Sequence, residues 1–332
     1  MDEHIPLVSI GIPVYNGEAF LRQCLDSILH QTFQDFEIII ADNASTDQTE
    51  AICQEYAAQD QRIRYHRNAQ NLGAARNYDL TFELSRGQYF KWAAHDDLIA
   101  PTYLERCVEV LEQDSSVVLC HSITALIDGE GHEIPFDVER DCFVDREGHA
   151  FRKLDRPRNF DSAAPHVRYG EVLTGTRWCF EVFGLVRSEP FRRSSKHGAY
   201  YGSDKVLLSE LSLVGRFVLL PEPLFFNRRH SNQSASLATA RAREIWISPK
   251  KTKKFVSPRL LCTSGYLRAI FWADLTVFER VWCLLVFGSW LVRLDNWQRV
   301  WMDIVRGLPM GKGANLPASP PATSPVISVE EG

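Results

Sequence analysis

The chain has 332 residues, of which 45% are hydrophobic and 24% are charged, and it carries a net charge of −5. This composition is ordinary for a globular protein of one large or two modest domains, and the acidic balance gives no reason to expect a nucleic-acid partner. The eight cysteines are scattered without a Cys-x-x-Cys pair, and residues 1–6 form no secretory signal, so we expect reduced core thiols in a cytosolic protein.

Strand-like and helical segments alternate through the first 120 residues. Compact apolar runs predict buried strands at 7–13, 36–41, 62–66, 89–93 and 117–120. Helical spacing of apolar residues predicts helices between them at 18–31, 46–59, 73–85 and 101–113. Because the strands are continuously apolar and alternate with helices, we predict an α/β fold with a mostly parallel sheet and helices on both faces.

The second part of the chain has a less regular pattern. Residues 132–165 are polar and irregular, so we expect a loop over the site or an excursion from the fold. Strands are predicted at 177–186, 216–220 and 223–227, and an amphipathic helix is predicted at 203–213.

Two adjacent carboxylates, Asp96 and Asp97, directly follow the predicted strand 89–93. Open α/β sheets bind ligands at the carboxyl ends of their strands. Adjacent carboxylates repel each other unless a cation or a proton lies between them, and carboxylate oxygens suit Mg²⁺ or Mn²⁺ that holds substrate phosphates. A plain solvated turn is the alternative for the pair taken alone.

Further polar clusters follow the first three predicted strands. They contain Pro13, Tyr15 and Asn16 after the first strand, Asp42 and Ser45 after the second, and Asn71, Gly73 and Arg76 after the third. Asp42 could accept hydrogen bonds from a base or ribose, and Arg76 lies in the first turn of a helix, where the dipole favours anions. Ser45 could equally cap the next helix. Neither a dinucleotide glycine fingerprint nor a Walker sequence is present.

Taken together, these clusters resemble the family 2 glycosyltransferases of the GT-A fold, in the order 12–16, 42–47, 71–77 and 95–97. The resemblance covers about residues 5–235 and implies an inverting enzyme that depends on a nucleotide sugar. It implies that Pro13, Tyr15, Asn16 and Asp42 surround the base and ribose, and that Asp96 or Asp97 holds a divalent cation, Mg²⁺ or Mn²⁺, against the diphosphate. We take Asp96 as the metal ligand and assign donor contacts also to Ser45, Asn71, Gly73, Arg76 and Asp97.

One position departs from the family pattern. The family has an acid-x-acid-acid sequence, whereas this chain has Ala94 in the first position and His95 in the second. The carboxylate that faces the ribose is therefore missing. The departure leaves a catalytically inactive nucleotide-sugar-binding module open as an alternative function.

Two later clusters resemble the second half of the family. Asp204 lies at the start of a predicted helix, where inverting members have an acid that removes the proton of the acceptor hydroxyl. Arg229 and His230 follow a strand, where the family's segment contacts the diphosphate or completes the metal site, so we assign Arg229 to the donor and His230 to the metal. The alternatives are a helix N-terminal acid at Asp204 and a solvated basic loop at Arg229 and His230.

The resemblance and the composition divide the chain into three parts. We expect a GT-A catalytic domain at 1–240, with a nucleotide-sugar half at about 1–125 and an acceptor half at about 126–240. A helical segment is expected at 241–308 and a disordered tail at 309–332, which is rich in Pro, Ala and Ser.

Basic and aromatic residues are concentrated in 241–306, whereas acidic residues predominate before it. The tryptophans of this segment are Trp246, Trp272, Trp282, Trp290, Trp297 and Trp301. Tryptophan favours the headgroup region of a membrane and Lys250, Lys251, Lys253 and Lys254 favour an anionic leaflet, so peripheral membrane contact is one interpretation. A helical hairpin that packs on the catalytic domain or on a second subunit is the other.

These inferences predict a metal-dependent glycosyltransferase at the inner face of the cell membrane, in cell-envelope glycan synthesis. The donor is expected to be a nucleotide sugar, with UDP or dTDP favoured. The acceptor is expected to be a hydroxyl of a lipid-linked saccharide, glycolipid or polysaccharide. A nucleotidyltransferase of similar fold is a further alternative, but it typically needs a glycine-rich basic loop near the amino terminus, and residues 13–17 do not form one.

Overall fold

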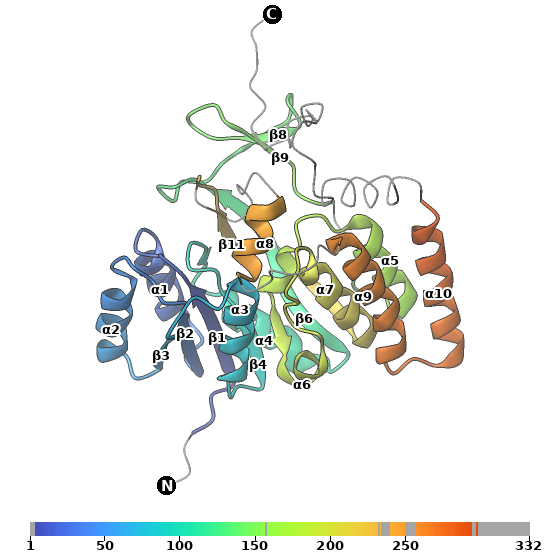
Figure 1. Cartoon of the computed structure of the whole chain (residues 1–332), viewed down its shortest axis with the longest axis horizontal. Coiled ribbons are helices and arrows are strands. Elements are labelled where there is room, and N and C mark those ends of the chain that lie inside the picture. Colours follow the sequence, from blue (N-terminus) through green and yellow to red (C-terminus); the bar gives the residue numbers. More distant parts are fainter. Residues whose placement is uncertain are drawn as a thin grey trace, which may run out of the picture.

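The structure is a computed structural model that describes residues 4–156, 158–231, 233, 240–249, 257–293 and 297. Its centre is an eight-stranded sheet in the order β3-β2-β1-β4-β10-β6-β11-β5 (Figure 1). The amino-terminal elements are β1 (Val8–Val14), α1 (Leu21–Leu29), β2 (Phe36–Asp42), α2 (Thr49–Gln59), β3 (Ile63–Arg67), α3 (Ala74–Glu83), β4 (Tyr89–Trp92), β5 (Leu98–Ile99) and α4 (Tyr103–Gln113).

Strands β1 to β4 run parallel, as the alternation of apolar strands with helices predicts, and the short β5 pairs antiparallel with a later strand. Every residue of β1 and β2 is buried, and the two strands pair in register from Val8–Phe36 to Val14–Asp42. They therefore end level with each other. Loops that follow β1 and β2 consequently meet at one edge of the sheet, where a ligand site is expected.

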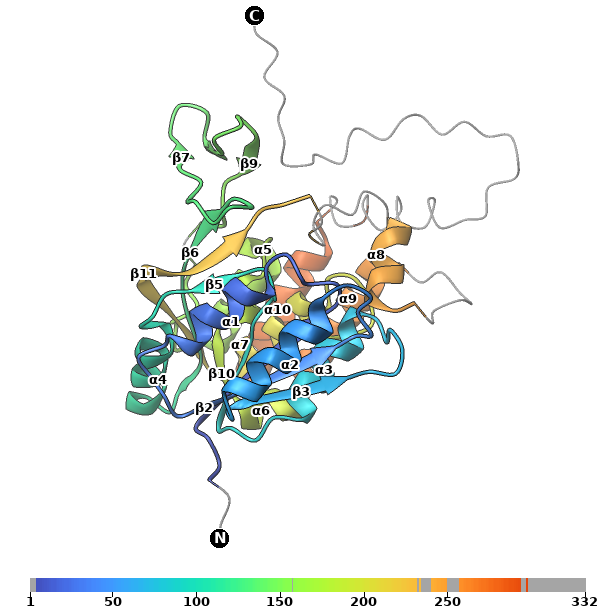
Figure 2. The same cartoon turned by 90° about the vertical axis from the view of Figure 1, so that its left-hand side faces the viewer.

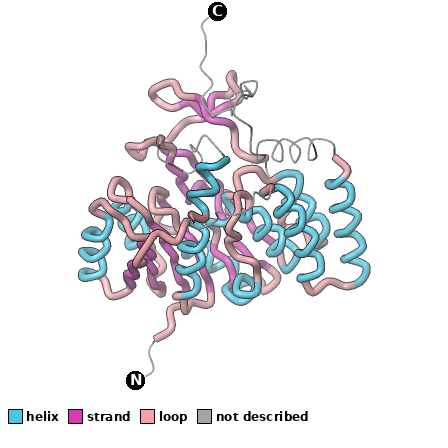
Figure 3. The backbone as a smooth tube through the Cα atoms, in the orientation of Figure 1, coloured by secondary structure: helices cyan, strands magenta, loops and turns pink. Residues whose placement is uncertain are grey.

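Helices cover both faces of the sheet. Apolar residues of α1, α2 and α4 pack on one face, and residues of α3 and of the carboxy-terminal helices pack on the other. The pattern Leu21, Cys24, Leu25 and Ile28 shows how α1 buries one stripe at helical spacing. Figure 3 shows the later helices gathered on one side of the strands.

The second half contributes the antiparallel part of the sheet. Its elements are β6 (Val117–Ile127), α5 (Pro165–Gly175), a 3₁₀ turn η1 (Phe180–Phe183), β10 (Leu185–Arg187), α6 (Ser188–Arg193), α7 (Ser203–Val214) and β11 (Arg216–Arg228). Strand β10 runs antiparallel to β4 and β6, and β11 runs parallel to β6. The predicted strands 216–220 and 223–227 are one strand with irregular register between Leu220 and Pro223.

The prediction of a strand at 177–186 was wrong over most of its length. Cys179 has a left-handed backbone, with φ 55°, and starts η1 instead. Only Leu185–Arg187 pairs with the sheet. The apolar run is buried against the sheet, and periodicity alone does not separate a buried turn from a short strand.

Residues 132–165 include a small sheet in place of a simple loop. Its strands are β7 (Phe136–Asp137), β8 (Cys142–Val144) and β9 (Ala150–Arg152). Figures 1 and 2 show this sheet projecting from the body of the molecule. The polar sequence conceals such short strands because they lie outside the main core.

The described part of 241–308 contains three helices, α8 (Ala240–Ile247), α9 (Pro258–Trp272) and α10 (Val277–Leu291). Helix α9 packs on α7, and α10 packs on α5, with Ala269, Ile270 and Cys283 fully buried. A capping box of Thr276 and Glu279 starts α10. In the part of the chain that the structure describes, no helix is long and apolar enough to cross a membrane. Lys250 to Lys254, Trp301 and the tail 309–332 lie outside the described residues.

Candidate functional site

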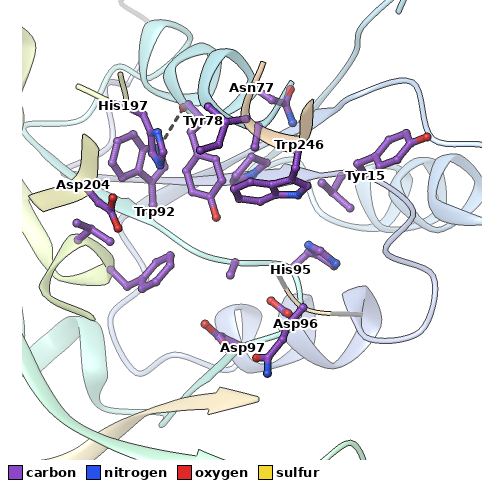
Figure 4. A pocket seen from close by; sticks show the side chains of 18 of the residues that line it. Tyr15, Asn77, Tyr78, Trp92, His95, Asp96, Asp97, His197, Asp204 and Trp246 are labelled. Atoms are coloured by element: carbon purple, nitrogen blue, oxygen red, sulfur yellow. Dashed lines mark hydrogen bonds between the residues drawn. The ribbon is translucent and has the colours of Figure 1, made fainter. Parts of the chain in front are cut away.

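A cleft of about 1160 Å³ opens at the carboxyl ends of the central strands. Residues of the amino-terminal half, of the second half and of α8 line it. Figure 4 shows Tyr15 at one end of the cleft and Asp204 with His197 at the other, while His95, Asp96 and Asp97 lie between the two ends. The cleft therefore brings the predicted donor, metal and catalytic clusters into one space.

The loop 94–97 holds its two carboxylates in different ways. Asp97 is buried, and its Oδ1 accepts hydrogen bonds from the backbone N of Arg228 at 2.9 Å and from Nδ2 of Asn227 at 3.0 Å. Asp96 instead has its Oδ2 2.9 Å from Nε2 of His230. Asp97 is thus anchored to β11, whereas the Asp96 carboxylate meets the imidazole that the sequence assigned to the same metal site.

Burial separates the acidities of the two carboxyl groups. Burial, and then the nearby charge of Asp96, raise the pKa of Asp97 to about 8. Burial also opposes ionisation of Asp96, but the hydrogen bond from His230 and the charge of His95 outweigh it, so the pKa of Asp96 is lowered. Near neutral pH the pair therefore carries about one negative charge. A proton on Asp97 reduces the repulsion between the two carboxylates, as a bound cation would.

The residues at this point fit a divalent cation. Asp96 and His230 offer a carboxylate oxygen and an imidazole nitrogen at contact distance, with side chains only 16% and 13% exposed. Mg²⁺ and similar ions are usually held by one or two protein groups, and substrate phosphates and water complete the shell. Within the described ranges, the one group of three ligand atoms close to one another is Asp145, Glu147 and His149, on the small sheet and outside the cleft.

The loops after β1 and β2 lock together at the predicted donor end. Asn16 has a left-handed backbone, with φ 51°, and its N–H donates to Oγ of Ser45 at 2.9 Å. Oδ1 of Asn16 accepts from the N–H of Thr46 at 2.9 Å. Pro13, Tyr15, Asn16 and Asn71 line the cleft, whereas Ser45 is buried behind Asn16.

Asp42, Gly73 and Arg76 do not line the cleft. The Asp42 carboxylate is fully buried and accepts from the N–H of Ser45, the hydroxyl of Tyr65 and the guanidinium of Arg67, each at 2.8 Å.

The other two residues have structural partners as well. Arg76 pairs with Glu83 on the surface of α3. Gly73 has φ 85°, and a Cβ there would lie 2.5 Å from the carbonyl oxygen of Ile247, so α8 packs on it closely. For these residues and for Asp42, direct contact with a donor stays a prediction.

The partners of Asp42 lead to a stability prediction. Asp42→Ala is expected to lower the free energy of unfolding by about 1–3 kcal/mol, because three donors lose a buried acceptor. The affinity for nucleoside diphosphate should fall less than it would after an alanine substitution at a residue that contacts the ligand directly. A melting curve beside a calorimetric titration measures both, and a large loss of affinity with unchanged melting would show that Asp42 touches the ligand instead.

The opposite end of the cleft is built around Asp204, at the start of α7. Gly202, with φ 87°, turns the chain into this helix, and Asp204 lines the cleft. His197 lies next to it: Nδ1 of His197 is 3.2 Å from Oγ of Ser203, and its backbone N–H donates to Asp79 at 2.9 Å. An imidazole is thereby held beside the predicted base (Figure 4).

Arg229 is buried at the cleft with part of its guanidinium unpaired. Its side chain lies over the ring of Trp178, 4.7 Å from the centroid, and the residue is 7% exposed. Its Nε and Nη2 have no hydrogen-bond partner among the residues that the structure describes. A buried, unsatisfied cation costs stability, so this geometry suits an anionic ligand.

Several lining residues were missed by sequence reasoning. Trp246 and Ile247 of α8 line the cleft although they follow the predicted catalytic domain, and Tyr78, Trp92 and His197 line it from the other side. For Trp178 and Phe180 the sequence left a pocket wall and a core position open; both line the cleft, with stacked rings 5.9 Å apart. Helix α8 reaches the site through tertiary packing, for which no local sequence signal exists.

Comparison with known proteins agrees with this geometry. The α/β sheet, with a carboxylate loop and a cleft at its strand ends, has the architecture of the GT-A fold. Residues 9–166 match the family model "Glycosyl transferase family 2". This part of the chain is therefore similar to a family of enzymes that transfer sugars.

Named relatives cover different shares of the chain. An uncharacterized glycosyltransferase of Haemophilus influenzae is 26% identical over 71% of this chain and 69% of its own length. Another, from Rickettsia typhi, is 37% identical over 40% of both chains. Chondroitin synthase of Escherichia coli is 35% identical over 40% of this chain and 19% of its own. The chain thus spans less than half the length of the last two.

Solved structures share the fold. TarS residues 1–349 of S. aureus, in complex with UDP or with UDP-GlcNAc, match 91% of this chain and 81% of TarS at 15% identity, with TM-scores of 0.57 and 0.55. The mannosyltransferase PcManGT of Pyrobaculum calidifontis, in complex with GDP-Man and Mn²⁺, matches 91% of this chain and 85% of its own at 15% identity and a TM-score of 0.50.

Proposed function

We propose that the chain transfers a sugar from a nucleoside-diphosphate sugar to an acceptor hydroxyl, with a divalent cation and with inversion at the anomeric carbon. The observation that carries this proposal is the shared cleft. Asp96, His230 and the partly unpaired Arg229 lie in it together with Asp204. A metal-bound diphosphate and a general base are the two requirements of this displacement.

The donor would occupy the end of the cleft near Tyr15 and Asn71. UDP, UDP-GlcNAc and GDP-Man are bound in structures of proteins that share the fold, which supports a nucleotide sugar as ligand here. We favour UDP or dTDP for the base. Trp246 and Tyr15, both partly exposed on the cleft, are suitable stacking surfaces for it.

The diphosphate would lie beside Asp96, His230 and Arg229. A divalent cation bound at Asp96 and His230 would neutralise the charge that develops on the leaving diphosphate. Arg229 would donate its Nε and Nη2 to phosphate oxygens, which satisfies nitrogens that otherwise have no partner in the described part of the chain. Asp97 would keep the loop in place through Asn227 and Arg228.

Asp204 would act as the general base. As the acceptor oxygen forms its bond to the anomeric carbon, Asp204 would take the proton of that hydroxyl, and the bond to the diphosphate would break on the opposite face. This in-line geometry inverts the configuration of the sugar. His197 beside Asp204 would help to orient the acceptor.

The acceptor is proposed to belong to a lipid-linked saccharide, glycolipid or polysaccharide of the cell envelope. One relative is a chondroitin synthase, which fits a polysaccharide acceptor. The same proposal includes the division into a catalytic domain at 1–240 and a helical segment at 241–308. Helix α8 follows residue 240 in sequence but lines the cleft, so we count it with the catalytic domain.

Helix α10 offers a surface for peripheral membrane contact. One face packs on α5, and the other exposes apolar side chains at helical spacing, namely Val277, Phe278, Val281, Trp282 and Leu285. Val277 is 82% exposed and Phe278 is 71% exposed. An apolar stripe of this kind, with basic residues near it in the sequence, is typical of helices that lie in a membrane interface.

This surface leads to a binding prediction. The protein should co-sediment with anionic liposomes at low salt and be released as salt rises, since each lysine near an anionic leaflet adds about 1 kcal/mol. Neutralising the lysines of 250–254 should abolish the salt-sensitive part of liposome binding, and Phe278→Asp should weaken the binding that remains. Ile5→Asp, at another exposed apolar residue, is the matched control. If the protein stays in the supernatant at low salt, the apolar stripe of α10 contacts protein and not a membrane.

An inactive binding module is kept as a second candidate because of one observation. Ala94 lines the cleft at the position where the family has a carboxylate. A thermal-stabilisation screen with nucleotide sugars tests the proposed donor site for both candidates. A ligand at a hundred times its dissociation constant adds about 2.7 kcal/mol to the free energy of unfolding. Stabilisation by no nucleotide sugar would contradict both, and sugar transfer separates the enzyme from the module.

A further inference from the structure

Two neighbouring segments from the second half of the chain contribute cationic side chains to the cleft lining. Arg152 ends β9 of the small sheet, and Arg177 follows α5; both side chains are exposed and line the cleft. The segments lie against each other, because Asp155 accepts from the N–H of Arg177 at 2.8 Å and the indole N–H of Trp178 donates to the carbonyl of Lys153 at 3.3 Å.

These two guanidinium groups lack the partners that nearby arginines have. Arg158 pairs with Asp155 and Glu181, and Arg156 pairs with Glu171. No hydrogen bond or ion pair joins the Arg152 or Arg177 guanidinium to another group within the described ranges.

The charge balance of this wall is therefore positive. From the second half of the chain, the described lining cations are Arg152, Arg177, Lys205, Arg228 and Arg229, against one described lining carboxylate, Asp204. Lys205 donates to the carbonyl of Leu173 at 3.2 Å, and burial lowers its pKa. In a chain with a net charge of −5, such an excess beside the predicted base favours an anionic ligand.

An aromatic surface adjoins these cations in the cleft lining. Trp178 and Phe180 stack with an interplanar angle of 1°, and Arg229 lies over Trp178. A stacked aromatic pair presents a flat apolar face of the kind that binds a sugar ring. A saccharide on this face would place one end near Asp204 and a neighbouring substituent near Arg152 and Arg177.

We propose that Arg152 and Arg177 form an anion subsite of the acceptor site, so that the acceptor carries a phosphate or carboxylate next to the sugar that is glycosylated. This inference rests on the proposed transferase function and narrows its acceptor class. The guanidinium groups bind phosphate and carboxylate oxygens through paired N–H donors. A neutral glycan would leave the two cations without a partner and would bind more weakly.

The test measures binding of defined saccharides to the full chain saturated with UDP and Mn²⁺. Hyaluronan tetrasaccharide supplies carboxylates, glycerol 3-phosphate supplies a phosphate, and chitotetraose is the neutral saccharide of matched length. Calorimetry or tryptophan fluorescence records binding. We expect at least one anionic probe to bind more tightly than chitotetraose, and the probe that does so identifies the anion.

Arg152→Gln and Arg177→Gln should each weaken binding of the anionic probe by roughly tenfold. Binding of chitotetraose and of UDP should stay unchanged. Arg146→Gln, at an exposed arginine of the small sheet outside the cleft, is the control and should change nothing. Equal binding of neutral and anionic probes, no binding of either anion, or unchanged binding in both variants would overturn the subsite. Failure of UDP to bind would instead refute the proposed function.

Discussion

Asp204→Asn is expected to lower turnover by two to four orders of magnitude, the usual cost of losing a general base. Asp204 lies at the start of α7 at the end of the cleft away from Tyr15, so the substitution removes a proton acceptor without touching the donor end (Figure 4). Asparagine keeps the size and the hydrogen-bonding oxygen of the side chain. The fold and the affinity for the nucleotide sugar should therefore change little.

Turnover at saturating donor and acceptor, measured beside donor affinity, checks this expectation. Asp274→Asn, at an exposed acid outside the cleft, is a suitable control with wild-type behaviour expected. If donor binding collapses in Asp204→Asn while turnover at saturation survives, Asp204 belongs to the donor site and another group is the base.

The second large effect is expected at Asp96. Asp96→Asn should lower metal-dependent turnover by roughly three orders of magnitude or more, because the carboxylate charge that would hold the cation against the diphosphate is lost. The amide oxygen can still accept from His230, so the melting temperature should stay near that of the wild type. Full activity of this variant, or of wild type in excess chelator, would contradict the metal assignment.

The same site predicts a dependence of metal binding on pH. The pKa of Asp97 is raised to about 8, so below this pH a bound proton competes with a cation beside Asp96. Affinity for Mn²⁺ should therefore rise as pH rises toward 8 and level off above it. By the same linkage, the metal-free fold becomes less stable as pH rises from about 4 to about 8. In this range the folded chain retains a proton on Asp97 that the unfolded chain releases.

Much of the fold followed from local patterns. The mostly apolar sequences of β1 and β2 predicted strands covered on both faces. The ends of β1 and β4 predicted where Asn16, Asp96 and Asp97 would meet. Strand β11, which pairs with β6, places His230 beside Asp96 of the loop 94–97 through contacts far apart in the chain. In that case the family resemblance supplied what local patterns lack.

Other residues show where sequence reasoning stops. Asp42 and Ser45 stand at the predicted strand end, but strand position does not reveal that Arg67 and Tyr65 already satisfy the carboxylate. Conversely, His197 and Trp246 have no motif around them. Their place in the cleft depends on the anchoring of His197 by Asp79 and on the packing of α8 against Gly73, both of which are tertiary contacts.

The central claim is sugar transfer from a nucleotide sugar at the cleft. Its most direct test is the release of nucleoside diphosphate from a panel of nucleotide sugars by the wild-type chain, with and without Mn²⁺, beside Asp96→Asn. We predict that a UDP- or dTDP-sugar yields nucleoside diphosphate only with the metal and that Asp96→Asn suppresses the release. Release that is equal in excess chelator and in the variant, or no release from any donor in the panel, would contradict the account.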